Sequence, residues 1–324
     1  MGNNSKIEWT HHTFNPWWGC MKVSEGCKNC YAETWDKRWG GGHWGPMTGR
    51  RLMSEDYWQL PLAWNARAAR TGIPMRVFCG SMCDIYEYHS EVWLLRQRLF
   101  ELIDCTPWLR WILLTKRPEN LPHFSPPSWI AGGFPPNVWL GVSAENQEQA
   151  DSRIPLLLDI PCSVRVLCCE PLLGPVDVSR YLVPEGVHHH PDNDLSGDIG
   201  RALNEMIRLA APSLQKRIHW VIAGGESGAQ GRVMHPDWIR LLHQQCQAAG
   251  VPFFFKQWGQ WGWCGGNSNK KHVGIWEGEK WPTLGLDAGD QDGVFVMISR
   301  GKKRTGRKLG GKEWLELPED STPR

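Results

Sequence analysis

Three cysteines near the N-terminus are the residues of this sequence best suited to chemistry. Cys20, Cys27 and Cys30 lie in the run GCMKVSEGCKNCYAE, between an aromatic-rich extended stretch and a predicted helix. Thiolates hold iron–sulfur clusters or zinc ions in proteins. A cube of four irons held by three thiolates keeps one iron free for another molecule. The cysteine count therefore predicts a cluster with one open iron.

A structural zinc ion is the alternative reading of the same cysteines. Its fourth ligand would be His11, His12 or His43, because Cys3His sites are common and the spacing C-x2-C serves both metals. We favour the open cluster because the loop follows the first predicted strand, at the end of a parallel sheet where active residues gather.

Composition sets wider limits. A chain of 324 residues with 41% apolar content is long enough for one α/β barrel, and its net charge of +2 predicts no strong bulk attraction to nucleic acid. No apolar run has the length of a membrane span and the first residues lack the core of a signal peptide, so we expect a cytoplasmic protein. The eleven cysteines then indicate thiols and metal ligands and argue against disulfides.

Tryptophan is unusually abundant, with 21 residues. These rings either fill a Trp-rich core and surface or provide stacking platforms for bases. The basic run 302–308 has a similar pair of interpretations. It is a solvated tail, or with Trp258, Trp261 and Trp263 it forms a rim that contacts phosphates.

Apolar runs alternate with segments of helical spacing, the pattern of a parallel sheet with right-handed crossovers. We predict a parallel (β/α) barrel, partial or full, over residues 1–259, with insertions near 40–51 and 185–216 and a small extension over 260–324. The predicted strands are Lys6–Phe14, Met75–Gly80, Trp111–Thr115, Val138–Val142, Val164–Cys169, His219–Ala223 and Pro252–Phe255, with a further strand-like run at Val294–Ser299. The predicted helices are Cys30–Trp39, Glu91–Ile103, Gln147–Leu158, Leu203–Leu209 and Asp237–Ala249.

Polar residues follow every predicted barrel strand, which favours a polar ligand at the carboxyl ends of the strands. Several of these polar residues also have a simpler structural interpretation. Glu170, before Pro171, would only cap the barrel, Lys116 would be a solvated charge, and the glycines at 224–228 would be a tight connection. The segments that follow the seven predicted strands are Asn15–Gly19, Gly80–Asp84, Thr115–Pro118, Ser143–Asn146, Cys169–Leu172, Gly224–Gly228 and Lys256–Trp258.

Four further cysteines lie in or beside predicted strands. Cys79 and Cys83 form a C-x3-C pair and Cys168 is followed by Cys169, which raises the question of a second cluster. Buried thiols that behave as small apolar groups are the simpler reading, and a role as hydrogen donor stays open. The run His188 to His190 reads as a solvated surface segment.

The motifs WTHHTFNPWWGC, C-x6-C-x2-C, LLTKRPENL, GVSAEN, CCEPLLGP, IAGGESG and GKKRTGRKLGGKEWLELP resemble the phage-associated three-cysteine-motif family across almost the whole chain. That family is itself similar to radical S-adenosylmethionine (SAM) enzymes. The usual radical SAM loop is C-x3-C-x2-C with an aromatic residue before the third cysteine. Here the first gap is six residues, Asn29 precedes Cys30, and the nearby aromatic Tyr31 follows it.

The resemblance implies a [4Fe–4S] cluster on Cys20, Cys27 and Cys30 whose fourth iron binds SAM. It implies reductive cleavage of SAM to a 5′-deoxyadenosyl radical, with electrons from an external donor of the flavodoxin or ferredoxin type. The implied cofactor contacts are Ser81 and Asp84 to the methionine ammonium, Ser143, Glu145 and Asn146 to the ribose, Glu170 at the barrel mouth, and Gly224, Gly225 and Glu226 beside the cofactor.

Two functions follow from these observations, and a third possibility keeps the cluster but uses it for electron transfer or sensing. The first is a radical SAM enzyme acting on a polar substrate, for which tryptophan content, basic residues and the implied phage association favour a nucleic-acid base or nucleotide. The second is a zinc-stabilised nucleic-acid-binding or interaction protein without redox chemistry. Catalytic residues beyond the cofactor site, the product and the oligomeric state are not predicted.

Overall fold

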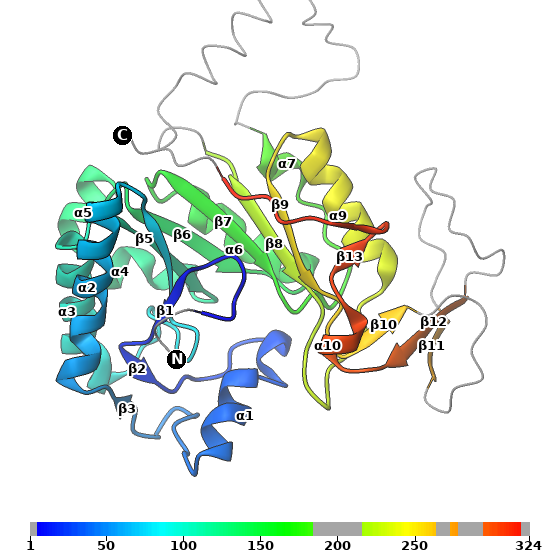
Figure 1. The fold of residues 1–324 in the computed structure, drawn as a ribbon, viewed down its shortest axis with the longest axis horizontal. Helices are drawn as coiled ribbons and strands as arrows, with labels where there is room; N and C mark the ends of the chain where they lie inside the picture. Colours follow the sequence, from blue (N-terminus) through cyan, green and yellow to red (C-terminus); the bar gives the residue numbers. More distant parts are fainter. Residues whose placement is uncertain (1–4, 184–215, 264–272, 278–293, 319–324) are drawn as a thin grey trace, which may run out of the picture.

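The chain folds around a curved sheet of seven parallel strands (Figure 1). The computed structural model describes residues 5–183, 216–263, 273–277 and 294–318. Neighbouring strands are all parallel, and within these residues the two edge strands do not pair with each other. The predicted parallel barrel is therefore confirmed in its partial form. In spatial order the strands are β1 (His12–Phe14), β4 (Met75–Cys79), β5 (Leu109–Thr115), β6 (Val138–Ser143), β7 (Val164–Cys169), β8 (Trp220–Gly224) and β9 (Phe253–Gln257).

Both faces of this sheet are buried, which explains why its strands read as nearly continuous apolar runs. Side chains such as Trp111 and Val221 pack against the covering helices in the larger core. A smaller cluster on the opposite face holds Trp9, Trp139 and Trp220, with Trp9 against Trp220 at a ring-centroid distance of 6.0 Å. Much of the tryptophan therefore lies in the core.

Four of the five predicted helices are confirmed, Gln147–Leu158 with the same bounds and the other three with bounds shifted by one or two residues. Their observed bounds are α1 (Tyr31–Arg38), α3 (Trp93–Asp104), α6 (Gln147–Leu158) and α9 (Pro236–Ala248). The fifth prediction, Leu203–Leu209, lies outside the described residues. Shorter elements are α4 (Leu121–Phe124), α5 (Pro127–Gly132), α7 (Ser179–Leu182), α10 (Lys302–Thr305) and the 3-10 turns η1 (Glu25–Cys27), η2 (Ser90–Val92) and η3 (Pro118–Asn120). None of the described helices is long and apolar enough to cross a membrane.

One long helix, α2 (Glu55–Thr71), was not predicted. It has regular ends, since the Ser54 hydroxyl accepts a hydrogen bond from the Tyr57 amide and Gly72 closes it at a φ of 68°. Pro61 inside the helix is a strong breaker signal in the sequence. Its buried tryptophans supply the apolar face that holds the helix on the sheet despite the proline.

The segment 40–51, predicted as an insertion, is anchored in the fold. The short strands β2 (Trp17–Trp18) and β3 (Arg51–Leu52) pair antiparallel. Arg50 is buried and makes an ion pair with buried Glu87, at 2.8 Å between Nη2 and Oε2. The other predicted insertion, 185–216, lies almost entirely outside the described residues, as does the His188 to His190 run.

The C-terminal residues complete one sheet edge. The Phe255 amide donates to the Trp314 carbonyl at 2.8 Å and the Glu316 amide donates to the Phe253 carbonyl at 3.2 Å, so residues 314–316 cover the outer edge of β9. A separate antiparallel sheet has the order β10-β12-β11. The division into a barrel and an extension stays a prediction. The remaining strands are β10 (Trp261–Trp263), β11 (Val273–Glu277), β12 (Val294–Ser299), β13 (Lys308–Leu309) and β14 (Lys312–Glu313).

Candidate cysteine site

The loop that carries the cysteines lies between β2 and α1, and Figure 1 shows it with α1 beyond the strand ends, apart from the helices that cover the sheet. Cys27 ends the turn η1, and Cys30 occupies the position just before the first turn of α1 without a side-chain capping bond. All three cysteines are partly exposed. Backbone and side-chain groups at the carboxyl ends of four strands hold this loop, and each contact is given below in the order of the strands.

The end of β4 holds the loop through Tyr31. The Tyr31 hydroxyl donates to the backbone carbonyl of Ser81 at 2.6 Å. The Ser81 hydroxyl itself lies 3.0 Å from Nδ2 of Asn15, which follows β1. Ser81, predicted to contact SAM, thus already joins the first two strand ends to α1.

The end of β5 places a cation beside the first cysteine. Arg117 Nη1 lies 3.8 Å from the sulfur of Cys20 and 2.7 Å from Oδ2 of Asp84, and Nη2 donates to the Met21 carbonyl. Asp84 also accepts from the Thr115 hydroxyl at 2.8 Å and from the Lys116 amide at 3.0 Å. Asp84, predicted to meet the methionine ammonium, therefore orients Arg117 against the cysteine loop.

The surroundings of Cys20 and Cys30 favour the neutral form of these two thiols. Burial raises the pKa of Cys20 to about 12, and the nearby Arg117 charge opposes this only in part. Burial also raises the pKa of Cys30. Metal ions displace the proton of a thiol that they bind, so such sulfurs become thiolate ligands only when a metal binds.

The end of β6 holds the middle of the loop through Glu145. Oε1 of Glu145 accepts from the Ser24 hydroxyl and from the Gly26 amide at 3.0 Å, while Oε2 accepts from Arg153 of α6 at 2.8 Å. Burial acts to raise the pKa of Glu145, but the charges of Lys116 and Arg153 outweigh it and the pKa is lowered. Glu145, predicted to bind ribose, is an ionised anchor of the cysteine loop.

The end of β8 holds the loop through Glu226. Oε2 of Glu226 accepts from the Asn29 side chain at 3.0 Å, and Oε1 accepts from Arg232 Nη2 at 2.7 Å. Arg232 in turn donates to the Glu25 carbonyl at 2.9 Å. Burial acts to raise the pKa of Glu226, but hydrogen bonds from Arg232 and Asn29 lower it overall. Asn29, which replaces the expected aromatic residue, is thus a polar attachment point.

Four other predicted cofactor residues, Asn146, Glu170, Gly224 and Gly225, also contact neighbouring residues. The Asn146 side chain caps α6 by accepting from the Gln149 amide at 3.0 Å, and Glu170 pairs with Lys256 at 2.8 Å. A Cβ atom on Gly225 would lie 2.0 Å from the Trp258 carbonyl oxygen, so close backbone packing requires this glycine, and Gly224 lies beside it against β9. Whether these residues also contact a cofactor stays a prediction.

Two polar side chains at the strand ends keep free hydrogen-bonding capacity. Within the described part of the chain, the Ser143 hydroxyl and the Lys116 ammonium have no hydrogen-bond partner. The charge of Lys116 acts on Cys30, Glu145 and Cys168. Cys168 is buried in the smaller core cluster with Trp9 and Trp220, as expected for a small apolar group. Lys116 is therefore a cation placed among the thiols.

The histidines proposed as zinc ligands have other neighbours. The His11 ring accepts from the Arg76 amide at 2.8 Å, the His12 ring stacks on Trp64 at 4.2 Å, and the His43 ring lies 2.8 Å from Asp36. Across residues 5–183, 216–263, 273–277 and 294–318, no group of three or more His, Cys, Asp and Glu side chains is placed to hold one metal ion. A zinc ion or a cluster on the three cysteines stays a prediction.

Sequence reasoning missed the residues that hold the loop. Ser24, Arg153 and Arg232 stand in no recognisable motif, and the separation of Asn29 from Glu226 is 197 positions. Arg117 was visible at a strand end, but nothing in its spacing indicates that its guanidinium turns toward Cys20.

Comparison with known proteins gives the family. The family described as "Protein of unknown function (DUF5131)" matches residues 4–318. The chain belongs to the DUF5131 family. No curated protein matches this DUF5131 chain.

Several solved structures of spore photoproduct lyase are similar to the DUF5131 chain. A tyrosine-to-phenylalanine mutant has 13% identity and a TM-score of 0.42. A double mutant with bound AdoMet and dinucleoside spore photoproduct has 11% identity and a TM-score of 0.42. Each match covers 93% of this chain and 71% of the other. At this identity and TM-score, the likeness says nothing about what this chain binds.

Proposed function

We propose that this chain is a radical SAM enzyme in which Cys20, Cys27 and Cys30 bind a [4Fe–4S] cluster. The observation that carries the proposal is the position of these three thiols. They lie on one loop beyond the carboxyl ends of a partial parallel barrel, and four strand ends hold that loop in place. Active residues gather at this end of parallel α/β barrels.

The donor set fits such a cluster. Thiolates are its usual ligands, and three of them leave one iron for a small ligand. Arg117 beside Cys20 and Lys116 near Cys30 place positive charge close to a group that carries negative charge when ligated by thiolates. When bound, the cluster and SAM would supply a 5′-deoxyadenosyl radical to a polar substrate, for which a nucleic-acid base or nucleotide is our choice.

The residues of the chain would position this chemistry. Asp84 fixes Arg117, Glu145 fixes the turn η1, and Glu226 with Arg232 fixes Asn29, so contacts within the chain position the cysteine loop. Ser143 and Lys116 have hydrogen-bonding capacity left for SAM or substrate. An external electron donor and the phage association stay predictions.

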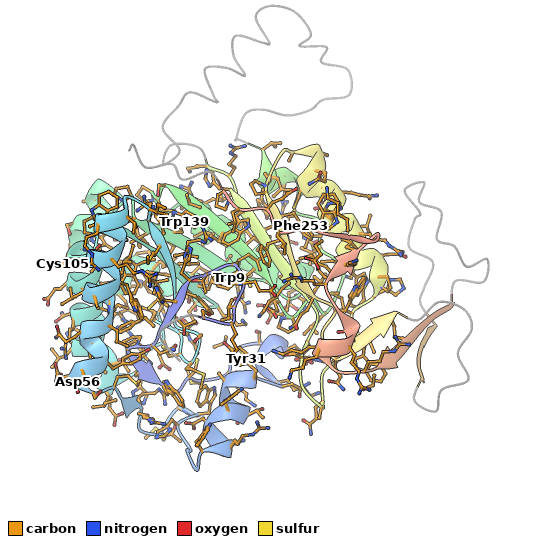
Figure 2. The ribbon with its side chains drawn as sticks, in the orientation of Figure 1. Trp9, Tyr31, Asp56, Cys105, Trp139 and Phe253 are labelled. Atoms are coloured by element: carbon orange, nitrogen blue, oxygen red, sulfur yellow. The ribbon has the colours of Figure 1, made fainter. Side chains whose placement is uncertain are left out.

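Anaerobic reconstitution with iron and sulfide tests the proposal. We expect a brown protein whose reduced cluster changes its electron paramagnetic resonance spectrum when SAM is added, and which releases 5′-deoxyadenosine from SAM. Cys20→Ala, Cys27→Ala and Cys30→Ala should each lose the four-iron spectrum. Cys105→Ala is the matched control, because Cys105 is exposed and lies far from Tyr31 in Figure 2.

Two results would overturn the proposal. Colourless protein that carries one zinc per chain after reconstitution would support the zinc-stabilised alternative. A cluster whose spectrum does not change when SAM is added, in a protein that forms no 5′-deoxyadenosine, would assign the cluster to electron transfer or sensing.

A further inference from the structure

Helix α1 exposes a continuous row of aromatic side chains. Tyr31, Trp35 and Trp39 follow one another at intervals of four residues, so they lie on one face of the helix and its C-cap. Their exposed fractions are 46%, 41% and 69%. The adjoining face, about 100° round the helix from Tyr31 and Trp35, buries Ala32 and Asp36. The Trp35 and Trp39 rings thus lie on an exposed face, whereas the Tyr31 ring is partly exposed and its hydroxyl reaches the Ser81 carbonyl.

The exposure of several large aromatic rings on one short helix calls for an explanation. Single exposed apolar residues are normal on protein surfaces, whereas adjoining ones mark interaction sites. Among the described residues, many other tryptophans are buried, for example Trp9, Trp111 and Trp220, while Trp93 and Trp108 are also exposed. What sets Trp35 and Trp39 apart from exposed Trp93 and Trp108 is that they stand four residues apart on the helix that follows the cysteines.

The row begins at the cysteine site. Cys30 is the residue before Tyr31, and the Tyr31 hydroxyl donates to the Ser81 carbonyl at the end of β4. Glu170 and Cys168, at the end of β7, are near enough to act on the Tyr31 phenol electrostatically. A ligand that stacks along the row would have one end at the thiols and the other at Trp39.

The charge beside the row is positive. The Arg38 guanidinium lies 5.7 Å from the ring centre of Trp35. Lys22 and Lys37 are exposed and share a single carboxylate, Glu33, at 2.8 Å and 2.7 Å. Within the described residues, exposed Lys28 and Arg38 have no carboxylate partner. Flat aromatic faces next to unneutralised cations suit a ligand with planar rings and phosphates.

We propose that Tyr31, Trp35 and Trp39 form a stacking track for single-stranded nucleic acid that leads to the cysteine site. Eight residues of helix span about 12 Å, which corresponds to roughly three or four stacked nucleotides at about 3.4 Å each. The delivery of a base to the cluster rests on the proposed function. The binding of the strand does not, because none of these three rings is a cluster ligand.

Binding of a fluorescent oligothymidylate, followed by anisotropy, tests the track in protein without cofactor and again after reconstitution. Replacing both Trp35 and Trp39 by alanine should weaken binding by at least about tenfold, and replacing both by phenylalanine should restore most of it. Trp108→Ala is the control, because Trp108 is 37% exposed and precedes β5, at the opposite end of the strands. Arg38→Ala should lower the slope of log Kd against log salt by about 0.7.

The two proposals fail separately. Unchanged binding in the double alanine variant, or an equal loss in Trp108→Ala, overturns the track. If the double variant instead abolishes a dimer seen by sedimentation and oligothymidylate does not bind, the row is a contact between copies and the track is wrong. Wild-type binding that depends on the two tryptophans, together with no 5′-deoxyadenosine, supports the track and overturns only the radical chemistry.

Discussion

Replacing Gly26 by alanine should displace the cysteine loop from the strand ends. A Cβ atom at Gly26 would lie 2.5 Å from Oε1 and 2.8 Å from Cδ of Glu145. That carboxylate has little freedom to move, because Ser24 and Arg153 also donate to it and the side chain is buried. The loop must therefore give way.

The expected cost follows from two linked effects. Overpacking a tight contact costs about 1–3 kcal/mol, and losing a hydrogen bond to a charged group costs about 1.5–3 kcal/mol. The movement that relieves the clash also stretches the bond from the Gly26 amide to Glu145, now 3.0 Å. Because the two effects share one displacement, we expect the free energy of unfolding to fall by about 2–4 kcal/mol in total.

Urea unfolding of the metal-free protein measures this cost, and iron content after reconstitution measures the effect on the site. Gly42→Ala is the matched control, because no atom lies within 4 Å of its added Cβ. Glu145→Ala removes the obstructing carboxylate, so Gly26→Ala should cost at least about 1 kcal/mol less in that background. Equal costs in both backgrounds would refute the contact as the cause.

Two other predictions concern the strand ends. The pKa of Glu226 is lower in the folded protein than the value of about 4.3 expected in the unfolded chain, so its ionised carboxylate stabilises the fold above about pH 4.3. This stabilisation is lost as the pH falls through the pKa of Glu226 in the folded protein. Glu226→Gln should therefore destabilise the metal-free protein at neutral pH and much less in acid. Urea unfolding at both pH values checks this, and an equal effect at both would contradict it. Gly225→Ala places a Cβ 2.0 Å from the Trp258 carbonyl oxygen and should lower the free energy of unfolding by at least about 3 kcal/mol, whereas Gly132→Ala, with nothing within 4 Å, should not. A stable Gly225→Ala variant in the same assay would show that β8 and β9 can separate there.

The sequence determined the strands of the partial barrel and their order. Runs such as Val138–Ser143 are almost wholly apolar and buried along their length, and a parallel sheet covered on both sides buries them fully. Residues that follow successive parallel strands lie at one edge of the sheet. The sequence thus also brought Asp84, Glu145 and Glu226 to the same end of the molecule as the cysteines.

Only the tertiary structure decided what these carboxylates contact. Each was predicted to face a cofactor, and each accepts hydrogen bonds from groups that hold the cysteine loop, from Arg117, from Gly26 and from Asn29. Strand periodicity gives the end of the sheet at which a side chain lies but not its partner. The partner depends on where a loop distant in the sequence crosses that end, because a buried carboxylate must find donors wherever the folded chain provides them.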